Sequence, residues 1–293
     1  MYLDKTKAVL LLITALFLCA ACSPLKTLNA LIPENGYSVM TDIAYGELNR
    51  QKLDVYLPKP KSGTDTPQQL ASGRALVIFF YGGSWDSGER SGYKFVAEAL
   101  TSKGFVVVIP DYRVYPEVRF PEFMRDPARV VKWSKQHAAQ YGADPKHVFV
   151  SGHSAGAHIA AMLTLDNEFL AAEGLEPPDL RGMFGLAGPY DFLPLTSNRL
   201  KTIFGAEDQW WRSQPINFVT GNNPPMLLLV GGKDNIVWPR NTFNLAARIK
   251  AAGGSVQVKE FSDYGHIDMA AKLAKPLRDE EMLNTIADFI RTH

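Results

Sequence analysis

Short apolar runs, separated by segments long enough to form helices, constrain the fold of this chain more than any other feature. The run Ala75–Tyr81, ALVIFFY, contains no charged or amide side chain, which is typical of a strand buried on both faces. Further strand-like runs begin near residues 105, 147, 183, 226 and 256, and helical patterns lie between most of them. Because strands joined through helices pair in parallel, the sequence predicts an α/β fold, with a mainly parallel central sheet and helices on both faces.

Two regions depart from this alternation. Tyr37–Tyr45 and Lys52–Leu57 alternate apolar with polar residues, which indicates two antiparallel strands. A stretch over about residues 189–224 contains several prolines and Trp210-Trp211 but no clear period, which favours a small cap-like insertion. With 293 residues, 46% of them hydrophobic, the chain is long enough for one large domain. We therefore expect a single domain over residues 22–293.

Charge and cysteine content exclude several classes of function. Lys and Arg number 31 against 30 Asp and Glu, a net charge of +1, so no broad basic field is available for binding nucleic acid. Both cysteines, Cys19 and Cys22, lie near the N-terminus. The rest of the chain therefore has no thiol for a disulfide scaffold, a thiolate metal site or cysteine catalysis.

The N-terminal segment has the features of a signal peptide. Two lysines precede the apolar run Ala8–Cys22, which is short for a membrane span and fits the apolar core of an export signal. Small residues directly before Cys22 resemble the cleavage site of bacterial lipoproteins, although Cys19 occupies the place of the usual leucine. We expect removal of residues 1–21, lipidation of Cys22 and an exported, membrane-anchored protein. The alternatives are ordinary signal cleavage, which gives a periplasmic or secreted protein, and an uncleaved anchor.

Ser154 occupies the position expected of a nucleophile. The pentapeptide Gly152–Gly156, GHSAG, directly follows a strand-like run and opens a helix of small residues. A sharp turn between a strand and a helix lifts a serine hydroxyl clear of the backbone, and the start of the helix presents free amide groups to the site. The alternative interpretation is a tight turn with an incidental serine.

A base and an acid follow later strands in the order that this chemistry requires. Asp234 follows the run MLLLV and His266 follows VQVKEF, so both leave the sheet at the edge where Ser154 lies. The sequence therefore predicts a catalytic triad of Ser154, His266 and Asp234. We interpret the remaining histidines as packing or surface residues. Asp263 and Asp268 are close in sequence to His266 and are poorer candidates for the acid.

The loop after the first buried strand is a candidate oxyanion hole. It reads Tyr81-Gly82-Gly83-Ser84-Trp85, and glycine allows backbone amides to turn toward a substrate oxygen. The expected donors are the amides of Gly83, Ser84 and Ala155, the last of which follows the nucleophile. We expect Trp85, and Trp210 of the cap, to contact substrate. The alternative is a glycine turn that only exposes an aromatic residue.

Taken together, these motifs resemble those of the hormone-sensitive-lipase-like and related carboxylesterases, which have the α/β-hydrolase fold. The loop Tyr81–Trp85 resembles their HGGGW segment, with Tyr81 in place of histidine and Ser84 in place of the third glycine. Asp111–Glu117 resembles their DYR-x-x-PE segment, in which we interpret Asp111 and Arg113 as a structural pair. The resemblance covers the chain from about residue 37 to its end.

This resemblance implies a serine hydrolase that cleaves carboxylic esters in two steps, through an acyl-enzyme. It implies no metal and no organic cofactor, and a small-molecule ester as the substrate. Aromatic residues in the loop and the cap favour short-chain or aromatic acyl groups. Two alternatives stay open: an arylformamidase-like amidase that uses the same triad, and a non-catalytic binding protein with the hydrolase fold.

Overall fold

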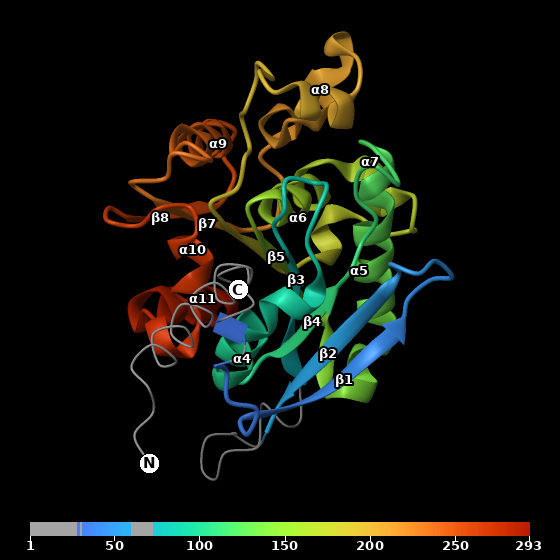
Figure 1. Ribbon diagram of the computed structural model, residues 1–293, viewed down its shortest axis with the longest axis vertical. Coiled ribbons are helices and arrows are strands. Elements are labelled where there is room, and N and C mark those ends of the chain that lie inside the picture. The colour runs from blue at the N-terminus through green and yellow to red at the C-terminus, as the bar shows by residue number, and fades with distance from the viewer. Residues whose placement is uncertain (1–27, 30, 60–72) are drawn as a thin grey trace, which may run out of the picture.

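The computed structural model describes residues 28–29, 31–59 and 73–293 (Figure 1). The predicted signal peptide and Cys22 lie outside these residues. None of the helices in the described part is both long and apolar enough to cross a membrane.

The described residues form eight strands, which alternate with helices. The strands are β1 (Tyr37–Ala44), β2 (Lys52–Pro58), β3 (Arg74–Phe80), β4 (Val106–Pro110), β5 (Ala143–His153), β6 (Gly182–Leu186), β7 (Met226–Gly231) and β8 (Val256–Phe261). The α-helices are α4 (Lys94–Ser102), α5 (Arg125–His137), α6 (Ala155–Leu165), α7 (Asn167–Ala171), α8 (Asn198–Phe204), α9 (Arg240–Ala251), α10 (Asp268–Ala271) and α11 (Glu280–Thr292). Short 3-10 helices are η1 (Arg90–Tyr93), η2 (Glu122–Met124), η3 (Ala138–Tyr141), η4 (Pro177–Asp179), η5 (Glu207–Ser213), η6 (Pro215–Phe218) and η7 (Lys275–Leu277).

The strands form one sheet in the order β1-β2-β4-β3-β5-β6-β7-β8. Strand β2 pairs antiparallel with β1 and with β4, and all the other pairs are parallel. The side chains of β3 are buried from its second residue onward, as an apolar strand in the middle of a covered sheet requires. The predicted α/β fold is confirmed, including the antiparallel pair at its start.

The strand order places the helices on both faces of the sheet. After β3 the chain crosses toward β2, and from β4 onward each crossover runs in the opposite direction, toward β8. Since parallel crossovers are right-handed, α4 lies on one face and α5, α6 and α9 lie on the other. The direction changes between β3 and β5, and such a switch point leaves a crevice at the carboxyl ends of the strands.

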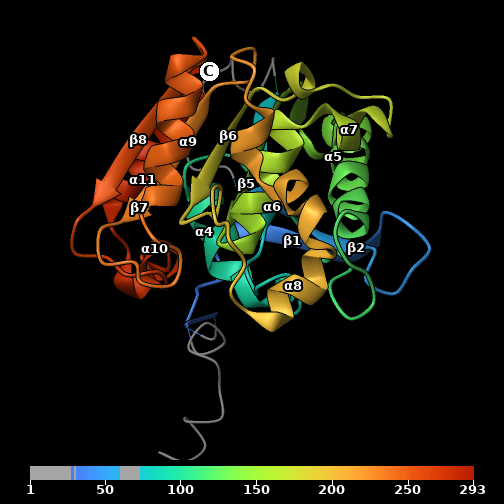
Figure 2. The ribbon, with the colours of Figure 1, turned by 90° about the horizontal axis from the view of Figure 1, so that it is seen from above.

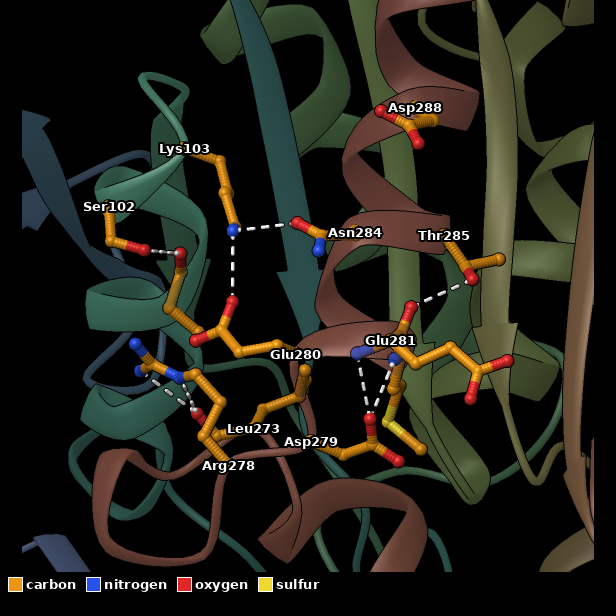
Figure 3. A network of polar contacts seen from close by, with 12 residues as sticks. Ser102, Lys103, Leu273, Arg278, Asp279, Glu280, Glu281, Asn284, Thr285 and Asp288 are labelled. Carbon is orange, nitrogen blue, oxygen red and sulfur yellow. Dashed lines mark hydrogen bonds and ion pairs between the residues drawn. The ribbon is translucent and has the colours of Figure 1, made fainter.

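The last helix returns to the face that α4 covers, and Figure 3 shows their contact. Lys103, the residue after α4, donates to Glu280 (3.1 Å) and to the Asn284 side chain (2.8 Å) on α11. The Asp279 carboxylate accepts bonds from two amides in the first turn of α11 and so caps this helix. This contact joins α4 and α11 on one face of the sheet.

Residues 189–224, the cap segment, connect β6 to β7 and contain α8, η5 and η6. Figure 1 shows α8 at the top of the molecule, and Figure 2 shows the same helix from above. The sequence pattern did not predict α7, α8 or α10. Each of these helices has seven residues or fewer, too few turns for a period to emerge and too short to be stable without tertiary contacts.

Candidate active site

Ser154 lies in a strained turn between β5 and α6. Its backbone has φ 55° and ψ −123°, and its amide donates to the Leu186 carbonyl at the end of β6 (2.9 Å). The helix approaches the sheet so closely that a methyl group on Gly156 would lie 2.0 Å from the Phe80 carbonyl oxygen. Glycine at position 156 therefore allows the nucleophile to stand at the carboxyl edge of β3 and β5.

The three predicted triad residues form one hydrogen-bonded chain. The Ser154 hydroxyl lies 2.9 Å from His266 Nε2, and His266 Nδ1 lies 2.8 Å from Asp234 Oδ2. His266 and Asp234 are only 7% and 4% exposed. Since a carboxylate only accepts, Nδ1 of a neutral His266 carries the proton and Nε2 is free to accept from the serine. The structure thus brings together loops that follow β5, β7 and β8.

The Asp234 carboxylate is held by its own loop. Its Oδ1 accepts from the amides of Ile236 (3.0 Å) and Val237 (2.8 Å), which leaves Oδ2 for the histidine. The rival acids have other partners: Asp263 pairs with Lys233 at the surface, and Asp268 accepts from the amide of Gly265. The geometry therefore favours Asp234 as the residue that orients His266.

Two of the predicted oxyanion donors, Gly83 and Ser84, line the same cavity as Ser154, and the third, Ala155, directly follows it. Gly83 and Ser84 have φ values of +139° and +50°, and the amides of Asp86 and Ser87 both donate to the Gly83 carbonyl, which closes a tight turn. Within the described residues, the amides of Gly83, Ser84 and Ala155 have no hydrogen-bond acceptor. Three free amide groups beside a serine hydroxyl can bind an oxyanion.

Tyr81, which stands where the resemblance predicts histidine, holds this loop through an arginine. Arg50 Nη2 donates to the Tyr81 hydroxyl (2.8 Å) and to the Gly88 carbonyl (2.8 Å), and its Nε donates to the Tyr112 carbonyl (2.9 Å). Burial raises the pKa of Tyr81, so its hydroxyl stays protonated. Sequence analysis missed Arg50, because it lies 31 residues before Tyr81 in a turn, and no residue near it in the sequence indicates this contact.

The expected pair between Asp111 and Arg113 is wrong. Asp111 pairs instead with Arg90, and Arg113 pairs with Asp126 (2.8 Å). Burial opposes ionisation of Asp126, but hydrogen bonds from Arg113 and Gln51 lower its pKa overall. The two residues are structural, as expected, yet each pairs with a different element: Asp111 with η1 and Arg113 with α5.

Two cavities meet at the nucleophile. The first, called here the histidine cavity, has a volume of about 650 Å³. It is lined by Gly82, Gly83, Ser84, Ser87, Gly88, Glu89, Gly92, Tyr93, His153, Ser154, Ile236, His266 and Ile267. The second, the tryptophan cavity, has about 460 Å³. It is lined by Ser84, Trp85, Ser154, Pro189, Phe192, Pro194, Leu195, Thr196, Leu200, Ile236, Val237, Trp238, Arg240 and Asn241. A bound carbonyl group at Ser154 would have one cavity on each side.

The structure separates the two tryptophans that were expected to contact substrate. Trp85 lines the tryptophan cavity, where its ring stacks on Phe192 with centroids 5.7 Å apart. Trp210 lines neither cavity: it is 6% exposed, and its indole donates to the Gly205 carbonyl (2.9 Å) inside the cap segment. The expectation for Trp210 is therefore wrong, because this ring forms the small core of the cap.

The cavity wall contains residues that sequence analysis missed. Phe192 and Leu200 come from the cap segment, where no pattern distinguished them from its other apolar residues. Ile236 and Trp238 follow Asp234 in the same loop. Because they lie two and four residues after the predicted acid, the sequence could have indicated that they line the site.

A buried histidine joins Trp85 to the cap. His158 Nε2 donates to the Ser213 carbonyl (2.7 Å), and its Nδ1 accepts from the Trp85 indole (3.1 Å). Burial lowers the pKa of His158 to about 4, which keeps the ring neutral. In the described part of the chain, no three His, Cys, Asp or Glu residues are grouped so that they could hold a metal ion.

Comparison with known proteins agrees with this architecture. The BD-FAE family model matches residues 53–249, well over half of the chain. The chain belongs to the BD-FAE family.

Relatives and solved structures extend this family assignment. A probable isoprenylcysteine α-carbonyl methylesterase of Arabidopsis thaliana is 25% identical over 86% of this chain and 56% of its own length, so the chain spans little more than half of that relative. A kynurenine formamidase of Danio rerio is 28% identical over 84% of this chain and 79% of its own. The structure of Thermogutta terrifontis esterase 2 is similar with a TM-score of 0.71 and 25% identity, over 89% of this chain and 96% of the other.

Proposed function

We propose that this chain hydrolyses carboxylic esters through an acyl-enzyme on Ser154. The observation that carries the proposal is the unbroken chain from the Ser154 hydroxyl through His266 to Asp234, at the point where the two cavities meet. The similarity to a methylesterase and to a solved esterase supports it.

In the first step Ser154 Oγ attacks the ester carbonyl while His266 Nε2 takes the hydroxyl proton. Asp234 keeps the imidazole in the required tautomer and stabilises the imidazolium. The carbonyl oxygen becomes an oxyanion, which the free amides of Gly83, Ser84 and Ala155 can bind. Loss of one such donor typically costs roughly 3–4 kcal/mol of transition-state stabilisation.

His266 then protonates the leaving alcohol, and water repeats the cycle to release the acid. The leaving oxygen must therefore lie beside His266. The histidine cavity is lined by His266 and the tryptophan cavity is not. We infer that the alcohol occupies the histidine cavity and the acyl group occupies the tryptophan cavity.

The tryptophan cavity supports a short-chain or aromatic acyl group. Trp85 and Phe192 form aromatic walls, Leu200 adds an aliphatic one, and a volume of about 460 Å³ has room for a short aliphatic or an aromatic acyl group. An apolar wall of this kind binds an acyl group by burial, and it gives little selection among groups of similar size.

A fluorophosphonate probe followed by a series of p-nitrophenyl esters tests this proposal. We expect labelling of the mature protein at Ser154, absence of labelling in Ser154→Ala, and faster hydrolysis of acetate or butyrate than of long-chain esters. A folded protein that is neither labelled nor active would contradict the proposal and favour a non-catalytic binding protein.

An arylformamidase-like activity is the second candidate, and the similarity to a kynurenine formamidase favours it. The same triad cleaves an amide if His266 protonates the leaving nitrogen. Turnover of an N-formyl aromatic amide with a larger kcat/KM than that of any p-nitrophenyl ester would make this the main activity.

For the N-terminus we propose export and lipidation of Cys22, on the basis of the apolar run and the small residues before it. Mass spectrometry of the membrane fraction from the native host would show a lipid-modified N-terminal peptide that begins at Cys22. Soluble protein with a free N-terminus elsewhere would contradict this.

A further inference from the structure

His153, the residue before the nucleophile, contacts the backbone of the catalytic histidine. It ends β5 and is buried, and its Nε2 lies 3.0 Å from the carbonyl oxygen of His266. The two imidazole rings lie with centroids 4.8 Å apart. The mechanism proposed above uses no atom of His153, so this contact has no role in it so far.

The hydrogen-bonding groups around His153 determine which of its nitrogens carries the proton. A carbonyl oxygen only accepts, so Nε2 must donate to His266. Burial lowers the pKa of His153 to about 3, so the ring is neutral and Nδ1 carries no proton. Nδ1 faces the hydroxyl of Tyr93 at 3.4 Å, and that hydroxyl is therefore the donor in this contact.

Tyr93 continues the connection to the oxyanion loop. Its hydroxyl oxygen accepts from the amide of Gly82 (3.1 Å), the residue before the predicted donor Gly83. Gly82 also packs directly on the turn: a methyl group there would lie 3.0 Å from the His153 carbonyl oxygen and 3.1 Å from Ser154 Cβ. Each of the three hydrogen bonds has one donor and one acceptor. Each donates in the same direction, from Gly82 to Tyr93, from Tyr93 to His153 and from His153 to His266.

We propose that Tyr93 and His153 are positioning residues that hold the oxyanion loop and the His266 backbone in one fixed arrangement around Ser154. This inference rests on the ester hydrolysis proposed above. The oxyanion donors and the base come from loops far apart in the sequence, and small misplacements of catalytic groups reduce rates strongly. The 3.4 Å contact is the weakest link, so the His266 side of the connection should matter more than the Tyr93 side.

Two substitutions at position 153 separate the two links. Asparagine places a side-chain oxygen near the position of Nδ1, so His153→Asn keeps the acceptor for Tyr93 and loses the donor to His266. Glutamine reaches the position of Nε2, so His153→Gln keeps the donor to His266. We expect kcat to fall about 10- to 100-fold in His153→Asn and within about fivefold in His153→Gln, with KM within about twofold in both.

Tyr93→Phe removes a single oxygen and tests the other end. We expect a fall in kcat of about threefold, and a weaker inhibition by a trifluoromethyl ketone, whose bound form places an oxyanion in the hole. His147→Asn serves as the control, because His147 lies in the first half of the same strand, six residues before His153, and lines neither cavity. Its kcat should equal that of the wild type.

The outcomes separate this inference from the function on which it depends. A wild-type protein without labelling or turnover would overturn the proposed function, and the positioning role with it. An active wild type in which His153→Asn and His153→Gln lose kcat equally, or neither loses it, would overturn the positioning role alone. Denaturant unfolding of each variant measures its free energy of unfolding and so shows whether a loss of kcat is accompanied by a loss of stability.

Discussion

The catalytic triad and the cap segment meet at the tryptophan cavity, which Ser154 and several cap residues line, but they are built in different ways. Each triad residue follows a strand of the sheet, and the polar atoms of Asp234 and His266 all have partners. The cap consists of short helices that a few separate contacts join to the rest of the domain: His158 donates to the Ser213 carbonyl, and the Phe120 amide donates to the Ile203 carbonyl.

Contacts between the cap and the oxyanion loop make this contrast sharper. Arg199 of α8 pairs with Asp86, which directly follows the oxyanion loop. The Arg199 side chain is exposed, whereas that of Asp86 is buried. Asn241 of α9 accepts from the amides of Tyr190 and Asp191 and so fixes the start of the cap. The sheet edge carries the groups proposed for the chemistry, whereas the cap contributes part of the wall of the tryptophan cavity. Substitutions on the two sides should therefore change different quantities.

The largest effect is expected on the triad side, from Ser154→Ala. Without the nucleophile we expect kcat to fall by about 10⁶-fold. The unfolding midpoint should stay close to that of the wild type, because the amide bond to Leu186 is retained. Initial rates with p-nitrophenyl acetate and a thermal melt measure both quantities. Turnover near the wild-type rate would remove Ser154 from the mechanism.

Asp234→Asn should produce the next largest loss, about 10⁴-fold in kcat. An asparagine amide can donate to Nδ1 and so favours the wrong tautomer of His266, although it has nearly the same shape as aspartate. The protein should still react slowly with a fluorophosphonate and should fold normally. A loss of less than tenfold would show that another residue orients His266.

The two buried histidines, His153 on the triad side and His158 on the cap side, should make stability depend on pH. Burial lowers their pKa values to about 3 and about 4, below the unfolded value of about 6.5. Between pH 6.5 and 4 the unfolded chain binds more protons than the folded one. The contribution of these two histidines to the free energy of unfolding is therefore constant above about pH 6.5 and falls as the pH decreases, by up to about 1.4 kcal/mol per unit for each histidine.

Urea unfolding at pH 6.5 and pH 5 measures this dependence. His158→Gln removes one of the two groups, so its loss of unfolding free energy over this interval should be smaller than that of the wild type by roughly 1.5 kcal/mol. An identical loss in both proteins would mean that His158 takes up its proton in the folded state.

On the cap side, Leu200→Trp should change selectivity rather than chemistry. An indole at position 200 fills part of the tryptophan cavity, so kcat/KM for hexanoate should fall about tenfold relative to acetate. Trp210→Phe is the matched control: it changes an aromatic ring of the same segment that lines neither cavity, and its chain-length profile should equal that of the wild type. A change in the control but not in Leu200→Trp would place the acyl group elsewhere.

Local pattern was sufficient for the elements on which the chemistry stands. The apolar run of β3, the GHSAG pentapeptide and the positions of Asp234 and His266 after strands all follow from short stretches of sequence. In a parallel sheet the carboxyl ends of the strands share one edge, so residues that follow strands come together without further information. The expected positions of the triad residues therefore agree with the structure.

The cap shows where this reasoning stops. Trp210 and Leu200 belong to the same irregular segment, and nothing in their neighbours distinguishes a ring that packs inside the cap from a side chain that lines the cavity. The same holds for Asp111 and Arg113, whose partners come from other elements. Short helices without a period carry little local information.

The sequence by itself thus determined the α/β sheet, the nucleophile turn, and the acid and base that follow later strands. Only the tertiary structure decided that Arg50 supports the oxyanion loop and that Tyr93 and His153 connect this loop to His266. It also decided which cap residues line the tryptophan cavity. The physical reason is the range of the interactions. Strand and turn preferences act between near neighbours, whereas these contacts join residues that only the folded sheet and its loops bring within hydrogen-bond distance.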